Sequence, residues 1–192
     1  QARKPNVIML HGLSGSGKST IAASLSQLLP AIWIRSDVER KRLLGSFDGI
    51  QGSSLKGDMY VSEANSATYQ RLLDLTKMLT GYGYCVIVDA TFLKVKQRQI
   101  FYQAFIKKYP LVVIDLHADE NTLRQRVYQR AKESDNISDA DVAVLEKQLH
   151  SIEPVDKAEA VSVLILDVNR SINPKQLVNK VRRAINTMDK AD

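Results

Sequence analysis

One run of eight residues constrains the fold of this chain more than any other part of it. Residues 12–19 have the sequence GLSGSGKS and match the pattern G-x-x-x-x-G-K-[ST] in full. An apolar run at 7–10 precedes the pattern, and helical spacing of apolar residues at 18–29 follows it. Glycines let backbone N–H groups curl around an anion, and the start of the following helix adds its positive dipole. The sequence therefore predicts a phosphate-binding loop between a strand and a helix.

The residue types in this loop predict a nucleoside triphosphate with Mg²⁺ as the ligand. Lys18 is expected to reach the β- and γ-phosphates, and Ser19 is expected to offer an oxygen to Mg²⁺. ATP is the expected nucleotide, with GTP as the alternative. The residues expected to bind the nucleotide are Gly12, Ser14, Gly15, Ser16, Gly17, Lys18, Ser19 and Thr20.

Apolar strand-like runs alternate with helical patterns along the chain. Buried strands separated by helices are typical of a doubly wound parallel sheet. The predicted fold is therefore α/β, a P-loop NTPase fold with a five-stranded parallel sheet and helices on both faces. A segment rich in Gly and Ser at 45–58 is expected to form a mobile loop. Strands are expected at 7–10, 31–34, 84–88, 111–116 and 161–166, and helices at 18–29, 37–44, 62–79, 95–107, 121–130, 139–150 and 174–188.

Length and composition predict a single domain at 1–192. The net charge of +6 permits acidic partners such as nucleotides, phosphorylated small molecules or nucleic acid. The one cysteine, Cys85, begins an apolar run and is expected to be a core thiol in a reducing cytoplasm. No apolar run approaches the roughly 18 residues of a membrane span. The chain does not begin with Met, so a partner domain on its N-terminal side is an open alternative.

Other classes of phosphate-loop protein need features that this sequence lacks. GTPases recognise their base with N-K-x-D, but the one Asn-Lys pair, Asn179-Lys180, continues with Val and Arg. The chain is also short for an AAA-type or ABC-type motor. Small phosphoryl-transfer kinases remain, and these need an acceptor site, a base and a lid.

Asp37 and Arg40 follow the expected strand at 31–34, at the edge where open α/β sheets bind ligands. They are three positions apart and would share one face of a helix. The carboxylate can accept a proton from an acceptor hydroxyl, and the guanidinium can hold a phosphate or a developing charge. Both residues are therefore candidates for catalysis and for acceptor binding.

Four segments of the chain carry a family resemblance. Residues 11–20, 34–44, 86–92 and 123–130 together resemble the zeta-toxin, polynucleotide-kinase and chloramphenicol-phosphotransferase branch of P-loop kinases. The chain is most similar to the "predicted kinases" of that branch, some of which are fused to an aminoglycoside-phosphotransferase-like domain. The resemblance covers nearly the whole chain in order and implies the P-loop fold described above.

The resemblance also implies roles for single residues. Asp37 would be the general base that activates the acceptor hydroxyl, with Arg40 beside it. Asp89 ends a Walker-B-like segment and would bind Mg²⁺ through water or contact the acceptor. Thr91 would line the site, and Arg98 would be the basic residue that polynucleotide-kinase-like members place at this spacing, here on the acceptor.

A short lid is expected at about 124–138. Its first part follows L-x-x-R-x-x-x-R and resembles the lid entrance of adenylate-kinase-like enzymes. By that resemblance Arg126 would stack on adenine and Arg130 would reach the transferring phosphate. A guanidinium can stack on flat rings and can bind two phosphate oxygens at once. Arg124 is the rival for either role.

These residues predict an ATP-dependent phosphotransferase that moves the γ-phosphate to a hydroxyl of a small molecule. Lys18, Asp37, Arg40 and Arg130 would be its catalytic residues. One alternative is a kinase of nucleic-acid 5′-hydroxyls, for which the basic run at 94–98 gives weak support. Another alternative is a nucleotide-binding regulatory ATPase module of a larger protein.

Overall fold

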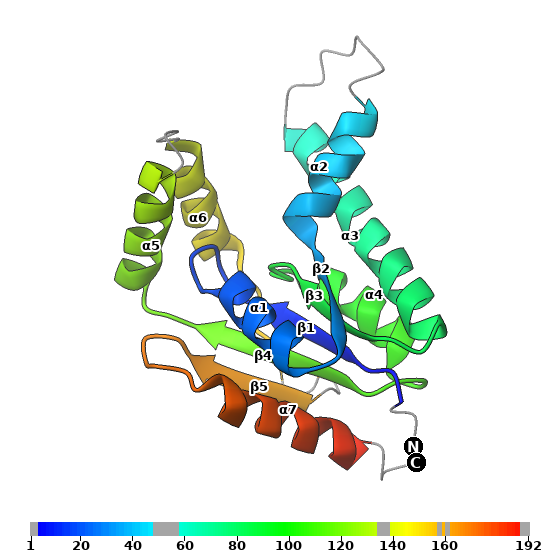
Figure 1. Cartoon of the computed structure of the whole chain (residues 1–192). Coiled ribbons are helices and arrows are strands. Elements are labelled where there is room, and N and C mark those ends of the chain that lie inside the picture. Colours follow the sequence, from blue (N-terminus) through cyan, green and yellow to red (C-terminus); the bar gives the residue numbers. More distant parts are fainter. Residues whose placement is uncertain (1–3, 48–57, 134–138, 157–158, 160–161, 189–192) are drawn as a thin grey trace.

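The computed structural model of the chain describes residues 4–47, 58–133, 139–156, 159 and 162–188 (Figure 1). The five strands form one parallel sheet in the order β2-β3-β1-β4-β5. The predicted α/β fold with a five-stranded parallel sheet is confirmed. In chain order the elements are β1 (Val7–His11), α1 (Lys18–Leu28), β2 (Ala31–Arg35), α2 (Ser36–Phe47), α3 (Asp58–Gly81), β3 (Cys85–Asp89), α4 (Val95–Phe105), β4 (Leu111–His117), α5 (Glu120–Glu133), α6 (Asp139–Ser151), β5 (Ser162–Asp167) and α7 (Pro174–Met188).

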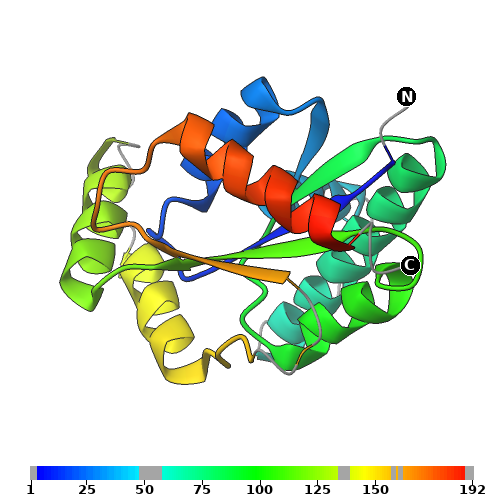
Figure 2. The same cartoon turned by 90° about the horizontal axis from the view of Figure 1, so that it is seen from below.

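Helices cover both faces of the sheet (Figure 2). Successive side chains of a strand point to opposite faces, and the apolar residues of β1 are fully buried on both. Val7 and Met9 pack with residues of α3 and α4, whereas Ile8 and Leu10 pack with residues of α1 and α7. A strand buried on both faces needs a continuous apolar run, which is why the central strands show no polar alternation.

The sheet order brings the ends of three strands together at one edge. Because β1 lies between β3 and β4, the loop after His11 begins in the middle of the sheet. Asp89, at the end of β3, is opposite Leu10 on one side and opposite Arg35, at the end of β2, on the other. Connections leave the sheet in opposite directions on the two sides of β1, and open α/β sheets form their ligand crevice at such a point.

Two helix pairs rise beyond this edge and flank it (Figure 1). α2 packs against α3 on one side, and α5 packs against α6 on the other. The α5–α6 pair has a small core of Leu123, Val127 and Leu145, against which Leu13 packs. This pair therefore stands at the position predicted for the lid and is attached to the loop that follows β1.

Some element boundaries differ from the predicted ones. α2 continues to Phe47 and α3 begins at Asp58, so each helix extends further toward residues 48–57 than predicted. Residues 48–57 of the predicted mobile loop, and residues 134–138 of the predicted lid, lie outside the described residues. Among the described residues, no helix is long and apolar enough to span a membrane.

The environment of Cys85 corrects another prediction. This residue is half-buried at the start of β3 and is not part of the core, since the strand's burial begins one residue later. Its sulfur accepts a hydrogen bond from Asn6 Nδ2 at 2.9 Å. The thiol therefore lies at the amino end of the sheet, opposite the edge where the phosphate loop begins.

Candidate functional site

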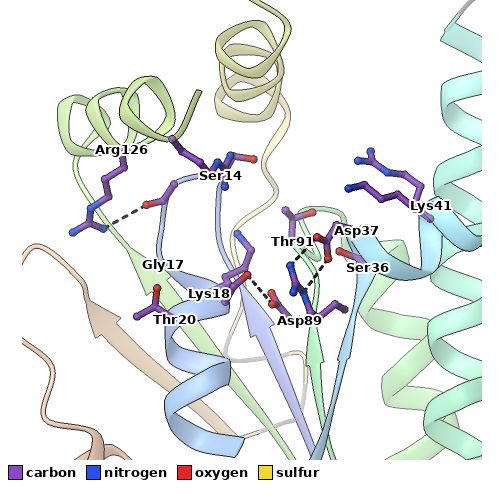
Figure 3. Close-up of a pocket in the computed structure, with 15 residues that line it drawn as sticks. Ser14, Gly17, Lys18, Thr20, Ser36, Asp37, Lys41, Asp89, Thr91 and Arg126 are labelled. Carbon is purple, nitrogen blue, oxygen red and sulfur yellow. Dashed lines mark hydrogen bonds and ion pairs between the residues drawn. The ribbon is translucent and has the colours of Figure 1, made fainter. Parts of the chain in front are cut away.

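A cavity of about 700 Å³ lies at the carboxyl edge of the sheet, between the phosphate loop, α2 and α5 (Figure 3). It brings together most of the residues predicted for the site, although Gly12, Ser16 and Arg98 do not line it. Its lining also includes Arg35, Ser36 and Lys41, which the sequence analysis did not single out. The lining residues are Ser14, Gly15, Gly17, Lys18, Ser19, Thr20, Arg35, Ser36, Asp37, Arg40, Lys41, Asp89, Thr91, Arg126 and Arg130.

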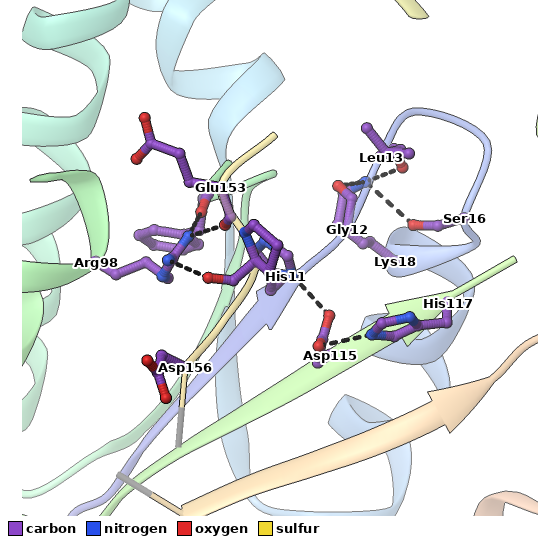
Figure 4. A network of polar contacts seen from close by, with 12 residues as sticks. His11, Gly12, Leu13, Ser16, Lys18, Arg98, Asp115, His117, Glu153 and Asp156 are labelled. Atoms are coloured by element: carbon purple, nitrogen blue, oxygen red, sulfur yellow. Dashed lines mark hydrogen bonds and ion pairs between the residues drawn. The ribbon is translucent and has the colours of Figure 1, made fainter. Parts of the chain in front are cut away.

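The phosphate loop holds the side chain of Lys18 against its own backbone (Figure 4). Lys18 Nζ donates hydrogen bonds to the carbonyl oxygens of Gly12, at 3.0 Å, and Leu13, at 2.7 Å. It also donates to Ser16 Oγ at 3.4 Å. Gly12 and Ser16 are buried beneath the loop, so they hold Lys18 in place instead of lining the cavity.

The electrostatics of this loop suit an anion. Loss of hydration lowers the pKa of Lys18 from 10.5 to about 8, the nearby Asp89 opposes this change, and Arg130 adds to it. The charged form of Lys18 is therefore poorly solvated in the free protein. A phosphate that enters the cavity would place a negative charge beside the ammonium group and so replace the lost hydration.

The start of α1 is also available to an anion. Gly17 precedes the helix with φ of 84°, in the left-handed region that favours glycine, and no side chain caps the first turn. The first N–H groups of a helix have no partner within the helix and bind phosphate readily. The residues of the loop therefore fit the polyphosphate of a nucleotide.

Ser19 and Asp89 meet at the floor of the cavity. Ser19 Oγ donates a hydrogen bond to Asp89 Oδ2 at 2.8 Å, and the indole N–H of Trp33 donates to the same oxygen at 3.2 Å. A hydroxyl and a carboxylate are the hard oxygen donors that Mg²⁺ prefers. Within the part of the chain that the structure describes, no group of three or more His, Cys, Asp or Glu residues could hold a metal. The pair thus fits a Mg²⁺ ion that takes its other ligands from phosphates and water.

Asp37, the predicted base, is held by a residue that the sequence analysis missed. Arg35 Nε and Nη2 donate to the two carboxylate oxygens of Asp37, at 3.2 and 2.8 Å. The Arg35 guanidinium also lies over the ring of Trp33, 5.2 Å from its centre. Trp33 and Arg35 are two positions apart in β2, so their side chains point to the same face of the sheet. This spacing in the sequence could have identified both as neighbours of the site.

Thr91 lies in the turn between β3 and α4, which Tyr69 fixes from α3. Tyr69 Oη is 3.2 Å from Thr91 Oγ1 and accepts a hydrogen bond from the N–H of Phe92 at 3.0 Å. Phe92 has φ of 50°, an unusual value for a residue other than glycine. The carbonyl of Thr91 accepts from the N–H of Gly12 at 3.2 Å, so the turn is tied to the phosphate loop. No local pattern in the sequence points to Tyr69.

The predicted lid arginines take different positions. Arg126 donates to the carbonyl oxygens of Gly15, at 3.4 Å, and Val168, at 3.0 Å, and so bridges the phosphate loop and the segment after β5. Arg130 lines the cavity, is exposed, and forms no hydrogen bond or ion pair with the described residues. Its guanidinium is therefore available to a bound phosphate.

Arg124, the rival for these roles, has a structural position instead. It forms an ion pair with Glu120 within α5 at 2.9 Å, and its ion pair with Glu146 at 2.8 Å fixes α5 to α6. From α6, Gln148 Oε1 accepts a hydrogen bond from the backbone N–H of Ser14 at 2.8 Å. The α5–α6 pair is thereby fastened to the phosphate loop at Ser14 as well as at Gly15.

The assignment of Arg98 to acceptor binding is wrong. Its side chain is completely buried, and Nε and Nη2 donate to the carboxylate of Glu159 at 2.8 and 2.7 Å. Its other N–H groups donate to the backbone carbonyls of Phe92, Glu153 and Pro154 (Figure 4). All three nitrogens of the guanidinium donate hydrogen bonds, most of them to the segment between α6 and β5, which they hold against α4. The side chain therefore does not reach the cavity.

A second buried network lies beneath the phosphate loop (Figure 4). Asp115 accepts hydrogen bonds from His11 Nδ1 at 2.6 Å and from His117 Nε2 at 2.7 Å. Burial raises the pKa of Asp115, but the hydrogen bonds from both histidines outweigh it and hold the pKa below its usual value. His11 is 2% exposed and lies outside the cavity, as expected for a structural residue.

Similar curated proteins come from mycobacteria and are called uncharacterized. Rv2004c of Mycobacterium tuberculosis (strain H37Rv) and Mb2027c of Mycobacterium bovis are each 35% identical to this chain over 85 residues. The match covers 43% of this chain and 17% of either relative. The chain thus spans less than a fifth of the length of the curated relatives it matches.

Several solved structures share the fold over nearly the whole chain. Kti12 of Chaetomium thermophilum in complex with ADP-AlF3 has a TM-score of 0.70, is 19% identical, and matches over 93% of this chain and 98% of that one. A sugar kinase from Janibacter sp. HTCC2649 has a TM-score of 0.66, 18% identity and 95% coverage of each chain. A gluconokinase from Sinorhizobium meliloti 1021 has a TM-score of 0.64, 19% identity and 99% coverage of each chain. At these identities the likeness shows a kinase-type P-loop fold alone.

A family match covers the site itself. A family model described as AAA domain matches residues 7–155, which include the phosphate loop, Asp37, Asp89 and α5. Because the match extends over more than half of the chain and the fold is that of P-loop kinases, the chain belongs to this AAA domain family of P-loop proteins.

Proposed function

We propose that this chain is an ATP-dependent phosphotransferase that moves the γ-phosphate to a hydroxyl of a small molecule, with Asp37 as the general base. One observation carries the proposal: a single cavity is lined by the phosphate loop, the Ser19–Asp89 pair and Asp37. A phosphate donor held by the loop and a hydroxyl held at Asp37 would then face each other. Such alignment of donor and acceptor is most of what phosphoryl transfer requires of a protein.

On the donor side, Lys18 and the loop amides bind the phosphates, and Arg126 is proposed to stack on adenine. Ser19 and Asp89 would hold Mg²⁺, which when bound spreads the negative charge of the triphosphate. Arg130 is exposed in the cavity and without a partner among the described residues, so it is the better placed arginine to stabilise charge on the transferred phosphoryl group.

On the acceptor side, Asp37 removes the proton of the hydroxyl. The acceptor oxygen forms a bond to the γ-phosphorus, the bond from that phosphorus to the bridging oxygen breaks, and ADP leaves. Each carboxylate oxygen has two lone pairs, and Arg35 uses one on each oxygen, so a lone pair remains for the proton. Arg35 therefore orients the base without blocking it.

A small-molecule acceptor is favoured over a nucleic-acid 5′-hydroxyl. The basic run at 94–98 was the support for nucleic acid, and two of its cations are engaged elsewhere. Arg98 is buried on Glu159, and Lys94 Nζ donates to the carbonyl of Ser151 at 2.6 Å. We also propose that this chain is fused to or paired with another domain, since the mycobacterial relatives are much longer than the matched segment.

Substitution of the base tests this function. Labelled ATP and Mg²⁺ are supplied with a panel of sugars, aminoglycosides, nucleotide-sugars and 5′-hydroxyl oligonucleotides, and labelled products are measured. Asp37→Asn is expected to bind ATP normally and to lose about 100-fold or more of the transfer rate. Asp74→Asn, the same change on the exposed surface of α3, is the control and should match the wild type.

Three results would count against the proposal. Near-normal transfer by Asp37→Asn would remove Asp37 as the base. Hydrolysis of ATP without a labelled product from any acceptor would favour the regulatory ATPase module instead. A product from the oligonucleotides alone would select the nucleic-acid alternative.

A further inference from the structure

Two cationic side chains of α2, Arg40 and Lys41, line the cavity. Arg40 and Lys41 are both exposed, and neither forms a hydrogen bond or ion pair with the residues that the structure describes. Figure 3 shows Lys41 on the α2 side of the cavity, with Asp37 between it and Lys18. These two charges therefore lie on the acceptor side and not over the phosphate loop.

Both carboxylates of α2 are already engaged by arginines. Asp37 is paired with Arg35 through both oxygens. Glu39, the other acidic residue in the first turns of α2, is 4% exposed and accepts from Arg42 and Arg71. The fold thus directs Glu39 toward α3 and away from the cavity, while Arg40 and Lys41 have no partner among the described residues.

The charged side chains that line the cavity form two groups, one on the nucleotide side and one on the acceptor side. On the nucleotide side, Lys18, Arg126 and Arg130 face Asp89, which leaves a surplus of two positive charges. A triphosphate carries about four negative charges and Mg²⁺ two positive ones, so the bound pair would cancel this surplus. On the acceptor side, Arg35 and Asp37 cancel each other, and the two charges of α2 remain.

We propose that the acceptor carries a carboxylate or phosphate group besides its hydroxyl, and that Arg40 and Lys41 bind this anion. The inference rests on the proposed function and narrows its substrate class. Arg40 and Lys41 follow Asp37 by three and four positions, so all three share one helix face with roughly 5–6 Å between neighbouring Cβ atoms. A hydroxy acid or a sugar phosphate carries both groups that such a face would bind, a hydroxyl for Asp37 and an anion for the two cations.

Matched pairs of acceptors test the anionic group. Gluconate is compared with glucitol, and ribose 5-phosphate with ribose, by transfer of labelled phosphate from ATP. The anionic member of at least one pair is expected to have a tenfold or greater advantage in kcat/KM, and this advantage should shrink as salt is raised. The pair that shows the advantage distinguishes a carboxylate from a phosphate. Equal or better use of the neutral members would overturn the inference while leaving the phosphotransferase function intact.

A variant locates the anion at α2. Lys41→Gln leaves a polar side chain that is one atom shorter and removes its charge, and Lys180→Gln makes the same change on the exposed face of α7. Lys41→Gln should raise the KM for the anionic acceptor about tenfold and leave the KM for ATP unchanged, whereas Lys180→Gln should change neither. A rise in the KM for ATP instead would place Lys41 on the nucleotide and contradict the inference.

A binding measurement separates this inference from the proposed function. Calorimetry with the same four compounds uses protein that holds Mg²⁺ and a non-hydrolysable ATP analogue. Binding of an anion that Lys41→Gln weakens supports the anion site even if no compound receives a phosphate, in which case the proposed function fails alone. Absence of binding by both anions overturns the inference.

Discussion

Burial lowers the pKa of Lys18 well below its ordinary value, and this predicts a pH dependence of nucleotide binding. Because burial lowers its pKa to about 8, free protein loses the charge as pH rises through that value. Phosphate binding needs the charge, so the affinity for Mg-ATP is expected to be constant near pH 7. The affinity should fall progressively above pH 8, which titrations from pH 6.5 to 9.5 would measure.

The matched variant for this prediction is Lys18→Met, which has no charge to lose. Its affinity should be weaker at every pH and should not show the decline above pH 8. If the wild type and the variant had parallel pH profiles, the decline would belong to another group. A phosphate in the loop favours charged Lys18, so the decline in the complex begins later than in the free protein.

At the scale of residues, local pattern predicted the donor side of the site better than the acceptor side. Lys18, Ser19 and Asp89 follow strands or a loop motif directly, so position along the chain is enough to place them. Arg98 was misplaced because its partner Glu159 is 61 residues away and comes beside it only in the folded chain. Tyr69 escaped notice for the same reason, since its contacts with Thr91 and Phe92 join α3 to the turn after β3.

At the scale of elements, the phosphate loop and α5 are packed so closely that the loop depends on the helix. Gly15 has φ of 81°, and a Cβ atom there would lie 2.9 Å from the carbonyl oxygen of Leu123 and 3.1 Å from Val127. Gly15→Ala is expected to push α5 away from the loop and to weaken ATP binding about tenfold, as measured by calorimetry. The loss would follow from displacement of Arg126 as well as from strain at the loop itself.

Gly83→Ala is the control for this prediction. Gly83 also has a positive φ, 90°, but a Cβ atom there would meet nothing within 4 Å, and the residue lies in the turn before β3. The backbone strain is therefore similar without any contact to α5. Gly83→Ala should lower stability and leave ATP affinity unchanged, and an equal loss of affinity in both variants would show that strain alone is responsible.

The elements themselves were predictable in type, while their ends depended on tertiary packing. Continuous apolar runs identified all five strands because a strand with helices on both faces needs one. α3 was expected at 62–79 but runs from Asp58 to Gly81, and α2 reaches Phe47. These extensions lie outside the apolar spacing that identified each helix, so the sequence pattern could not indicate them.

At the scale of the whole molecule, a ligand bound between the two helix pairs should hold them together and stabilise the folded protein. The cavity is lined by α2 on one side and by α5 on the other, and it contains six cationic side chains against two carboxylates. Mutual repulsion among these cations is relieved when an anion enters. Mg-ATP at about 100 times its Kd should raise the free energy of unfolding by about 2.7 kcal/mol, which is about 5–10 °C in Tm.

Scanning calorimetry with and without Mg-ATP measures this shift. Lys18→Met serves as the control, because it removes the main contact to the phosphates while leaving α2 and α5 unaltered. Its Tm should barely respond to the same ligand concentration. A shift of equal size in the variant would mean that ATP stabilises the protein from somewhere else.

The strand order is the feature of the whole molecule that the sequence analysis did not supply. Alternation of strands and helices predicts a parallel sheet, but the order β2-β3-β1-β4-β5 depends on which strand pairs with which. That order sets Asp89 between Leu10 and Arg35 and so joins the proposed Mg²⁺ site to the proposed acceptor side. The residues of the site were therefore mostly foreseen, and their mutual positions were not.

Trp33 gives this arrangement a spectroscopic consequence. It is the single tryptophan of the chain, its indole N–H is bonded to Asp89, and its ring lies beneath the guanidinium of Arg35. All tryptophan fluorescence of this protein thus originates between the carboxylate proposed for Mg²⁺ and the arginine that orients the base. The chain carries an intrinsic optical probe at the junction of its donor and acceptor sides, and no label has to be attached to follow events there.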